Sequence, residues 1–516
     1  MFKQLSIELH PEMAASEEQY KKAIARKIGV SPREITGIEI LKKSIDARKI
    51  TPKIIMSVNV WWGEKMPEKE PFKLNLQDVT NKPEVIVVGA GPAGLFAALK
   101  LIENGFKPIV LERGKNVSER KVDVASINRN NALNEESNYC FGEGGAGTFS
   151  DGKLYTRSKK RGSTQYVLDV LKLHGAEAKI FTEAHPHIGT NNLPRIIVNI
   201  RETIVNAGGK IIFNTRVDDL IVENNEILGV ITQNGDKING KAVILATGHS
   251  ARDIYELLHK KSILLEAKSF AMGVRVEHNQ MLIDTNQYNL PERGKYLPAA
   301  SYSLVTQVEN RGVYSFCMCP GGYIVPAATS QNEMVVNGMS PSNRDSVYAN
   351  SGIVVEIREE DFPDQEKYGV LAGLKFQQYL EKLAFEKGGE NVIAPAQTIA
   401  DFVGKKNTAN LPATSYNPGV VNSDMHNWLP EFINKKLRHA FNEFNKKIKG
   451  FVSNDAIMLG VESRTSSPVR IPRDKDTLEH VQVANLYPCG EGAGYAGGIV
   501  SAAIDGIRCA EMISAK

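Results

Sequence analysis

The pattern of apolar and polar positions divides the chain into four regions. Residues 1–80 alternate apolar and polar positions around one helical stretch, which predicts a small βαββ module. Residues 81–265 contain apolar runs next to glycine and then short strands joined by Asn-rich turns, typical of a parallel sheet followed by a β-meander. Residues 266–452 are β-rich with amphipathic helices. Residues 453–516 again contain an apolar run next to a glycine-rich turn, as residues 81–265 do. We therefore predict an α/β protein in which an α+β domain is inserted into a Rossmann-like domain.

The most informative stretch is residues 84–113, EVIVVGAGPAGLFAALKLIENGFKPIVLER. Its apolar run at residues 85–88 predicts a buried strand, because helices cover both faces of a parallel sheet. A helix with one apolar face follows from Pro92 or Ala93, and a second short strand leads to Glu112. This order supplies the context in which a G-x-G-x-x-G turn indicates dinucleotide binding; the alternative is a glycine turn without a ligand.

Three glycines form that turn: Gly89, Gly91 and Gly94. The first permits a tight turn, the second lets the backbone approach a pyrophosphate, and the third lets the helix pack against the strand. The pyrophosphate would lie at the helix N-terminus, where free N–H groups favour an anion. Glu112 would accept hydrogen bonds from the adenosine ribose.

Two further glycine-rich stretches, residues 139–153 and 490–498, indicate that the backbone approaches a flat ligand or another segment. NAD alone would not need a glycine-rich strand–turn–helix so far down the chain, whereas FAD has a long second half. FAD is therefore the predicted cofactor, although residues 490–498 could instead be a packing turn. The predicted FAD contacts are Gly89, Gly91, Pro92, Ala93, Gly94, Glu112, Arg113, Gly144, Gly145, Gly147, Thr148, Thr247, Gly248, Gly490, Glu491, Gly497, Gly498 and Ile499.

Composition excludes several classes of protein. With 516 residues and a formal net charge of +4, the chain lacks the basic excess of a nucleic-acid or membrane-surface protein. It shows neither a membrane-length apolar run nor a signal-peptide pattern, so a cytoplasmic enzyme is expected. The five cysteines lack C-x-x-C and zinc-site spacing, which predicts reduced thiols and no metal. Cys317 and Cys319 would share one face of a strand, where buried hydrophobic packing is the expected role.

Several stretches together resemble one family. They are VGAGPAGLFAA, CFGEGGAGTFSDGKL, PHIGT, ILATGHSARD, CPGGYIVPA, ESRTSSPVRIPR and YPCGEGAGYAGGIVSAAIDGIR. The chain resembles the glutathione-reductase-like FAD superfamily, and in particular the bacterial FAD-dependent, or NAD(FAD)-utilising, dehydrogenases. The resemblance implies tight FAD binding and flavin redox chemistry with an undefined natural substrate.

The chain departs from the two-nucleotide-domain reductases of that superfamily. It contains neither a second G-x-G-x-x-G nor a C-x-x-x-x-C or C-x-x-C redox pair. NAD(P)H would therefore act as a transient electron donor without its own Rossmann domain. Flavin hydroxylases carry Gly-Asp where this chain has Gly490-Glu491, which favours dehydrogenation or reduction over oxygenation.

Candidate catalytic residues are few. Arg464 lies in a polar run ahead of residues 490–498, where it could bind an anionic substrate, stabilise reduced flavin or form a structural ion pair. His187, in a His-Pro-His turn, could move protons near neutral pH or act only as a loop hydrogen-bonding residue. His249 and Arg252 follow the Ala-Thr-Gly turn near the expected flavin.

Two functions from different classes remain. The first is a flavin oxidoreductase acting on an unidentified small molecule under the inserted domain, with oligomerisation as that domain's alternative role. The second is a flavin-dependent RNA-modifying or RNA-binding protein whose N-terminal module, with its basic residues 42–53, delivers the nucleic acid. The near-neutral net charge argues against the second.

Overall fold

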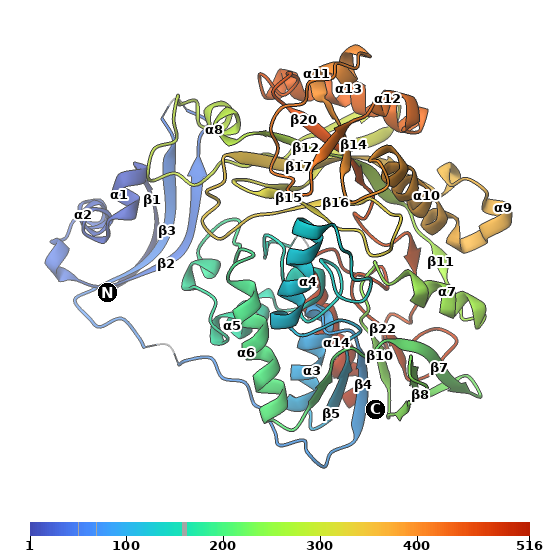
Figure 1. The fold of residues 1–516 in the computed structure, drawn as a ribbon. Helices are drawn as coiled ribbons and strands as arrows, with labels where there is room; N and C mark the ends of the chain where they lie inside the picture. Colours follow the sequence, from blue (N-terminus) through green and yellow to red (C-terminus); the bar gives the residue numbers. More distant parts are fainter. Residues whose placement is uncertain (50, 69, 157–161) are drawn as a thin grey trace.

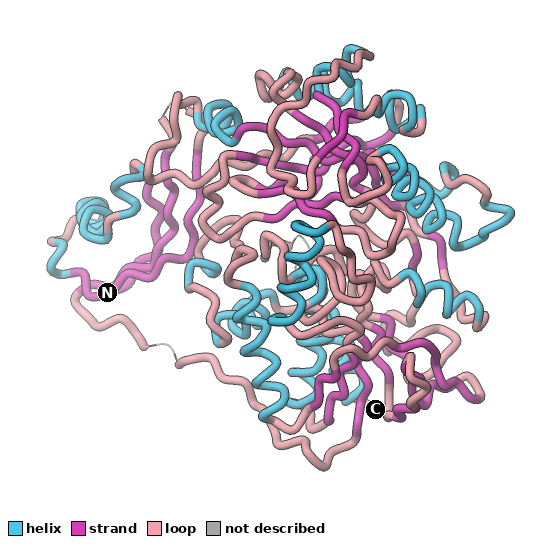
Figure 2. The backbone as a smooth tube through the Cα atoms, viewed as in Figure 1, coloured by secondary structure: helices cyan, strands magenta, loops and turns pink. Residues whose placement is uncertain are grey.

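Figure 1 shows the computed structural model, which describes residues 1–49, 51–68, 70–156 and 162–516. Three bodies of regular structure are visible: a small N-terminal domain, a lower domain around a parallel sheet, and an upper domain around a larger sheet. The strands of these bodies form separate groups in Figure 2. The α/β fold class predicted from the sequence is confirmed.

The N-terminal domain is a three-stranded antiparallel sheet in the order β1-β3-β2, covered by helices on one face. Alternate residues of β3, among them Met56 and Val58, are buried in the same core as Ile24 of α2. Ser16 caps the N-terminus of α2, and Gly29 ends that helix with a left-handed φ of 77°. The elements are β1 (Phe2–Leu9), α1 (Pro11–Ala15), α2 (Glu17–Ile28), β2 (Ile35–Asp46) and β3 (Lys53–Trp62).

The lower domain contains a parallel five-stranded sheet in the order β22-β10-β4-β5-β6. Every residue of β10 is buried, as expected for a strand covered on both faces. Helices α3 and α14 lie next to each other beside this sheet (Figure 1). The elements are β4 (Glu84–Val88), α3 (Pro92–Glu103), β5 (Lys107–Leu111), α4 (Val117–Asn130), α5 (Thr164–Leu173), α6 (Leu193–Asn206), β6 (Lys210–Ile212), β10 (Val243–Leu245), α7 (Arg252–Lys260), β22 (Leu486–Pro488) and α14 (Ile499–Ser514).

The predicted meander is shorter than expected. Only β7 (Val217–Glu223), β8 (Glu226–Thr232) and β9 (Lys237–Asn239) form the antiparallel sheet. The apolar segments that flank this sheet in sequence, at residues 210–212 and 243–245, form β6 and β10 of the parallel sheet instead. The turn at Gly240 separates β9 from the fully buried β10, so these two neighbouring strands belong to different sheets.

The upper domain is built on a seven-stranded sheet in the order β13-β14-β17-β12-β20-β18-β19. Because β20 is a central strand of this sheet, the domain extends past the expected boundary at residue 452. Its strands are β12 (Phe270–Asn279), β13 (Val305–Val308), β14 (Arg311–Cys319), β17 (Tyr348–Ile357), β18 (Ala394–Thr398), β19 (Val420–Asn422) and β20 (Ile457–Glu462), with the hairpin β15 (Tyr323–Pro326) and β16 (Val336–Met339). Its helices are α8 (Gln280–Tyr288), α9 (Gln365–Tyr368), α10 (Ala372–Lys387), α11 (Ile399–Gly404), α12 (Met425–Trp428) and α13 (Glu431–Lys447).

The two connections between the upper and lower domains run side by side. The outgoing strand β11 (Glu266–Ala267) pairs antiparallel with the returning strand β21 (Val469–Arg470). The parallel sheet takes strands from both sides of the upper domain in sequence, since β10 precedes β11 and β22 follows β21. The upper domain is therefore an insertion into the lower one.

The contact between α3 and α14 generates the first prediction. A Cβ built on Gly506 of α14 would lie 2.0 Å from the carbonyl oxygen of Ala93 in α3. We expect Gly506→Ala to force the two helices apart and to lower the free energy of unfolding by about 1–3 kcal/mol, the usual cost of overpacking. Urea unfolding measures this change.

The matched control is Gly404→Ala at the end of α11, where a Cβ has no neighbour closer than 3.9 Å. This variant should match or slightly exceed the wild type in stability, because alanine restricts the unfolded chain more than glycine does. Equal unfolding midpoints for both variants would contradict the proposed close contact.

Candidate functional site

A cavity of about 430 Å³ lies at the carboxyl ends of the parallel strands β4, β5, β10 and β22. This is the edge at which open α/β sheets bind their ligands. The lower domain supplies one side of the cavity, and residues of β14, β16 and β20 in the upper domain supply the other. The site is thus enclosed between the two domains.

Most of the predicted FAD contacts line this cavity. They are Gly89, Gly91, Pro92, Ala93, Glu112, Arg113, Gly145, Gly147, Thr247, Gly248, Gly490, Glu491, Gly497, Gly498 and Ile499. Five predicted site residues do not line it: Gly94, Gly144, Thr148, His187 and Arg252. Three of these residues, Gly94, Gly144 and Thr148, lie behind residues that line the cavity. They therefore shape the wall of the cavity without facing it.

Gly94 illustrates this supporting role. A Cβ there would lie 1.9 Å from the carbonyl oxygen of Gly89, so only glycine lets α3 start this close to β4. Gly91 is different, because its nearest neighbour would be the Cα of Gly145 at 3.9 Å. A side chain on Gly91 would therefore extend into the cavity instead of into the protein.

Two helix N-termini meet at the cavity. Helix α3 starts after Gly91 and α14 starts after Gly498, and neither of these N-cap residues provides a side-chain cap. The first-turn N–H groups of both helices are thus left for a ligand, and both helix dipoles place positive charge at the cavity. At Gly248, Gly497 and Gly498 a Cβ would meet no atom within 4 Å, which leaves bare backbone for a flat molecule. This arrangement fits an elongated anionic dinucleotide.

Glu112 is buried at the end of β5 and already has three backbone partners. Its carboxylate accepts hydrogen bonds from the N–H groups of Ala90 at 2.8 Å, Gly114 at 2.9 Å and Gly142 at 3.0 Å. A carboxylate offers about four lone-pair positions, so one remains for a ribose hydroxyl. Glu112 therefore also joins the first glycine turn to residues 139–153.

The glycine-rich loop at residues 139–153 is held by a side chain that sequence reasoning missed. Arg120 of α4 is fully buried and donates to the carbonyl oxygens of Asn138 at 2.8 Å, Tyr139 at 3.0 Å and Glu143 at 2.8 Å. A single arginine in a polar segment gives no sequence signal for such a role. Through these bonds Arg120 fixes the backbone that forms this wall of the cavity.

The upper-domain wall was likewise absent from the sequence-based site. It contains Phe316, Cys317, Asn337 and Glu462. Glu462 accepts a hydrogen bond from Arg275 at 2.9 Å, and both side chains are buried. Burial, opposed by Arg275, raises the pKa of Glu462 to about 7. The cavity therefore carries a group that can gain or lose a proton near neutral pH.

Arg464 lines the cavity, but its guanidinium is engaged within the protein. It donates to Thr329 at 2.7 Å, to Glu333 at 2.9 Å and to Glu381 at 2.8 Å. Arg252 joins the same group, with 2.6 Å to Glu381 and 3.1 Å to Glu333. Although burial opposes ionisation, Arg252 and Arg464 together hold the pKa of Glu381 below its ordinary value. Of the roles considered for Arg464, this geometry favours the structural ion pair.

The two histidines differ in position. Burial, with nearby Arg344, lowers the pKa of His187 to about 4, and its Nε2 lies 3.2 Å from the carbonyl oxygen of Ser342. His187 does not line the cavity, and with this pKa its ring is neutral near neutral pH, so the geometry favours the loop hydrogen-bonding role over proton transfer. His249 does line the cavity, with Nδ1 3.3 Å from Glu491 and Nε2 3.1 Å from the carbonyl oxygen of Arg464.

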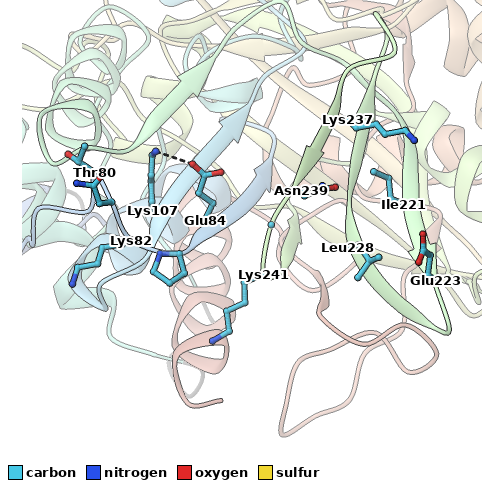
Figure 3. A pocket seen from close by; sticks show the side chains of 13 residues that line it. Thr80, Lys82, Glu84, Lys107, Ile221, Glu223, Leu228, Lys237, Asn239 and Lys241 are labelled. Atoms are coloured by element: carbon cyan, nitrogen blue, oxygen red, sulfur yellow. Dashed lines mark ion pairs between the residues drawn. The ribbon is translucent and has the colours of Figure 1, made fainter.

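A second depression lies away from this site and is drawn in Figure 3. Lys82, Lys107, Lys237 and Lys241 surround it at the amino ends of β4, β5 and β9, with Lys107 paired to Glu84 at 3.0 Å. It is at the sheet edge opposite the ligand-binding edge, so we do not assign it to the flavin chemistry.

Three families match parts of the chain. Residues 83–254 match the pyridine nucleotide-disulphide oxidoreductase family, and residues 269–465 match the family described as FAD-dependent protein, C-terminal domain-like. Residues 1–61 match a domain of unknown function, DUF8436. The cofactor is FAD, and the predicted FAD-dependent oxidoreductase class is confirmed at this level.

Similar proteins include an uncharacterized protein of Clostridium beijerinckii, 43% identical over 517 residues and covering 96% of both chains. Thiamine thiazole synthase of Aeropyrum pernix is 26% identical over 33% of this chain, which spans 56% of that enzyme. Among solved structures, the flavin-dependent brominase Bmp2 has 13% identity and a TM-score of 0.37, covering 84% of this chain and 79% of its own. These findings give no support to the RNA alternative. In the described residues, no helix has the length and apolar character needed to cross a membrane.

The geometry of Gly91 generates the second prediction. Because its Cβ would point into open space, we expect Gly91→Ala to fold normally while weakening FAD binding by about tenfold or more, equivalent to roughly 1.4 kcal/mol. The flavin-to-protein absorbance ratio after dilution measures retention, and circular dichroism measures folding. Full FAD retention in the variant would contradict the placement of the pyrophosphate.

Glu112 generates the third prediction. Glu112→Ala removes the acceptor of three backbone N–H groups, each costing about 1–3 kcal/mol when left unsatisfied in a buried site. The variant should therefore lose thermal stability as well as FAD. Glu202→Ala, at an exposed position of α6, is the control and should change neither. An FAD-free Glu112→Ala protein that melts like FAD-free wild type would show that the carboxylate serves the cofactor alone.

Proposed function

This chain belongs to the same family as the Clostridium beijerinckii protein, and we propose that it is a dehydrogenase or reductase. It would move a hydride or electrons between FAD and a small molecule that binds under the upper domain. NAD(P)H would be a transient donor that enters the same cavity, since the chain has no second G-x-G-x-x-G motif.

One observation carries this proposal: a single cavity extends from Glu112 to the upper-domain wall at Cys317 and Asn337. The lower-domain end has the features that hold the adenosine and pyrophosphate of a dinucleotide. The other end faces residues that the cofactor motifs do not account for. An inserted domain that closes over a cofactor commonly supplies substrate specificity.

The residues of the site have separable tasks. The N-termini of α3 and α14 bind negative charge, and Glu112 orients the ribose. FAD supplies the two-electron chemistry when bound. Glu462, with its pKa near 7, can hold or release a proton at the cavity wall, and the upper domain limits the access of water.

The buried group of Arg252, Arg464, Glu333 and Glu381 would set the position of the upper domain over the cavity. Arg252 comes from the lower domain, and Glu381 comes from α10 of the upper domain. Removing one member leaves an uncompensated buried charge, which typically costs 3–5 kcal/mol. Arg464→Ala is therefore a poor probe of catalysis, because it would disturb domain contact as well.

The fourth prediction tests the substrate end of the cavity directly. Asn337→Ala should retain FAD, because Asn337 lies on β16 away from the dinucleotide motifs. We expect anaerobic reduction of its flavin by NADH or NADPH to slow by about tenfold, corresponding to about 1.4 kcal/mol of transition-state stabilisation. Flavin absorbance in a stopped-flow instrument measures the rate.

The control is Asn442→Ala on the exposed side of α13, the same substitution in the same domain. It should reduce at the wild-type rate. Equal rates in both variants would place the electron donor elsewhere, and a wild-type flavin that neither nucleotide reduces would exclude NAD(P)H as the donor.

A further inference from the structure

Cys317 and Cys319 lie where β14 reaches the cavity. Cys317 lines the cavity and is partly exposed, whereas Cys319 is fully buried behind it. Cys317 has a left-handed φ of 46°, and the pairing of β14 with β17 shifts its register between Phe316 and Cys319. Such bulges and strained backbone positions are frequent next to active sites, where they re-aim side chains.

Both sulfurs share one cation. The Nζ of Lys153, from the glycine-rich loop of the lower domain, is 3.7 Å from the Sγ of Cys317 and 3.7 Å from the Sγ of Cys319. The same Nζ donates to the carbonyl oxygen of Met318 at 2.5 Å, which holds it in place. Arg275 adds a second cation, 3.6 Å from the Cys319 sulfur.

This environment favours a thiolate on the exposed sulfur. A hydrogen bond from the Cys319 thiol, with the charges of Lys153 and Arg275, holds the pKa of Cys317 well below its ordinary value against the effect of burial. The same hydrogen bond, together with burial, raises the pKa of Cys319. A thiolate on Cys317 beside a neutral thiol on Cys319, which donates to the Cys317 carbonyl oxygen at 3.2 Å, is the reduced form that thiol–disulfide chemistry requires.

We propose that Cys317 and Cys319 form a dithiol–disulfide pair that exchanges two electrons with FAD. The proposal deepens the proposed oxidoreductase function and rests on it. Oxidation of the pair forms the bond between the two sulfurs, releases the Cys319 proton and passes two electrons to oxidised FAD. The reverse step breaks that bond, returns a proton to Cys319 and restores the Cys317 thiolate.

The position of the pair defines the class of substrate. Cys317 is the sulfur that a molecule in the cavity can reach, so the pair would exchange with a small dithiol or disulfide. Lys153 is a positioning residue, because its charge stabilises the thiolate without taking part in bond formation. Purely structural cysteines would need neither a shared cation nor access to the cavity.

The experiment uses the FAD-loaded protein and its Cys317→Ser and Cys319→Ser variants. Anaerobic titration with dithionite should show that the wild type accepts about twice as many electrons as FAD alone, and that each variant accepts only the flavin's share. Alkylation and mass spectrometry of the air-oxidised wild type should show a Cys317–Cys319 disulfide. Dithiothreitol, as the dithiol probe, should reduce the wild-type flavin at least about tenfold faster than in either variant.

The matched control is Cys509→Ser, because Cys509 is buried on α14 and does not line the cavity. It should behave as the wild type in all three measurements. Lys153→Met should keep both thiols but slow iodoacetamide labelling of Cys317 at neutral pH.

Equal electron uptake by all variants, with both thiols alkylated in the oxidised protein, would overturn the proposal. This outcome is distinct from failure of the proposed function. If NADH and NADPH leave the flavin oxidised while dithiothreitol reduces it through the pair, the donor assignment fails and the redox pair stands.

Discussion

The close approach of α3 and α14 is the constraint on which the site depends. Gly506 allows α14 to lie against the backbone of Ala93, and Gly94 allows α3 to start directly above β4. These contacts bring two helix N-termini, from opposite ends of the chain, to one cavity. A pyrophosphate-binding turn alone needs only the first helix. The second helix extends the positive field along the cavity, which suits the longer cofactor FAD.

Buried ion pairs lie beside the upper-domain wall of the cavity. Arg252 and Arg464 with their two glutamates join the domains above the cavity, and Arg275 with Glu462 holds the end of β20. Buried ion pairs add little net stability, because desolvation offsets their attraction, but their geometry is strict. We interpret these networks as devices that position the upper domain over the cofactor. This also explains why an arginine in a conspicuous polar motif faces the cavity without being free to bind a substrate.

The sequence was most informative where a function depends on the spacing of residues along the chain. Gly91 and Glu112 became candidate cofactor contacts because a strand, a glycine turn, a helix and a terminal carboxylate occur in a fixed order, and both residues line the cavity. The sequence could not decide between the two roles considered for His187, because a histidine in a turn reveals nothing about burial, and burial is what lowers its pKa. The boundary of the upper domain was misplaced because β20, an apolar run, looks the same in either sheet. Arg120 was missed since its three carbonyl partners come from a loop some 20 residues away.

The sequence by itself determined the α/β class and the cofactor FAD, and it pointed to the glycine turn and Glu112 that line one end of the cavity. These properties follow from local periodicity and from glycines whose backbone must be bare. Only the tertiary structure determined the upper-domain end of the cavity, because Lys153 and Cys317 are 164 positions apart and meet only when the upper domain folds over the lower one. It also decided that Glu112 holds three backbone N–H groups and that Arg464 is bound within the protein. Contacts between distant segments cannot be read from the spacing of residues along the chain. The chemistry of this site therefore depends on how the inserted domain folds back onto the parallel sheet of the lower domain.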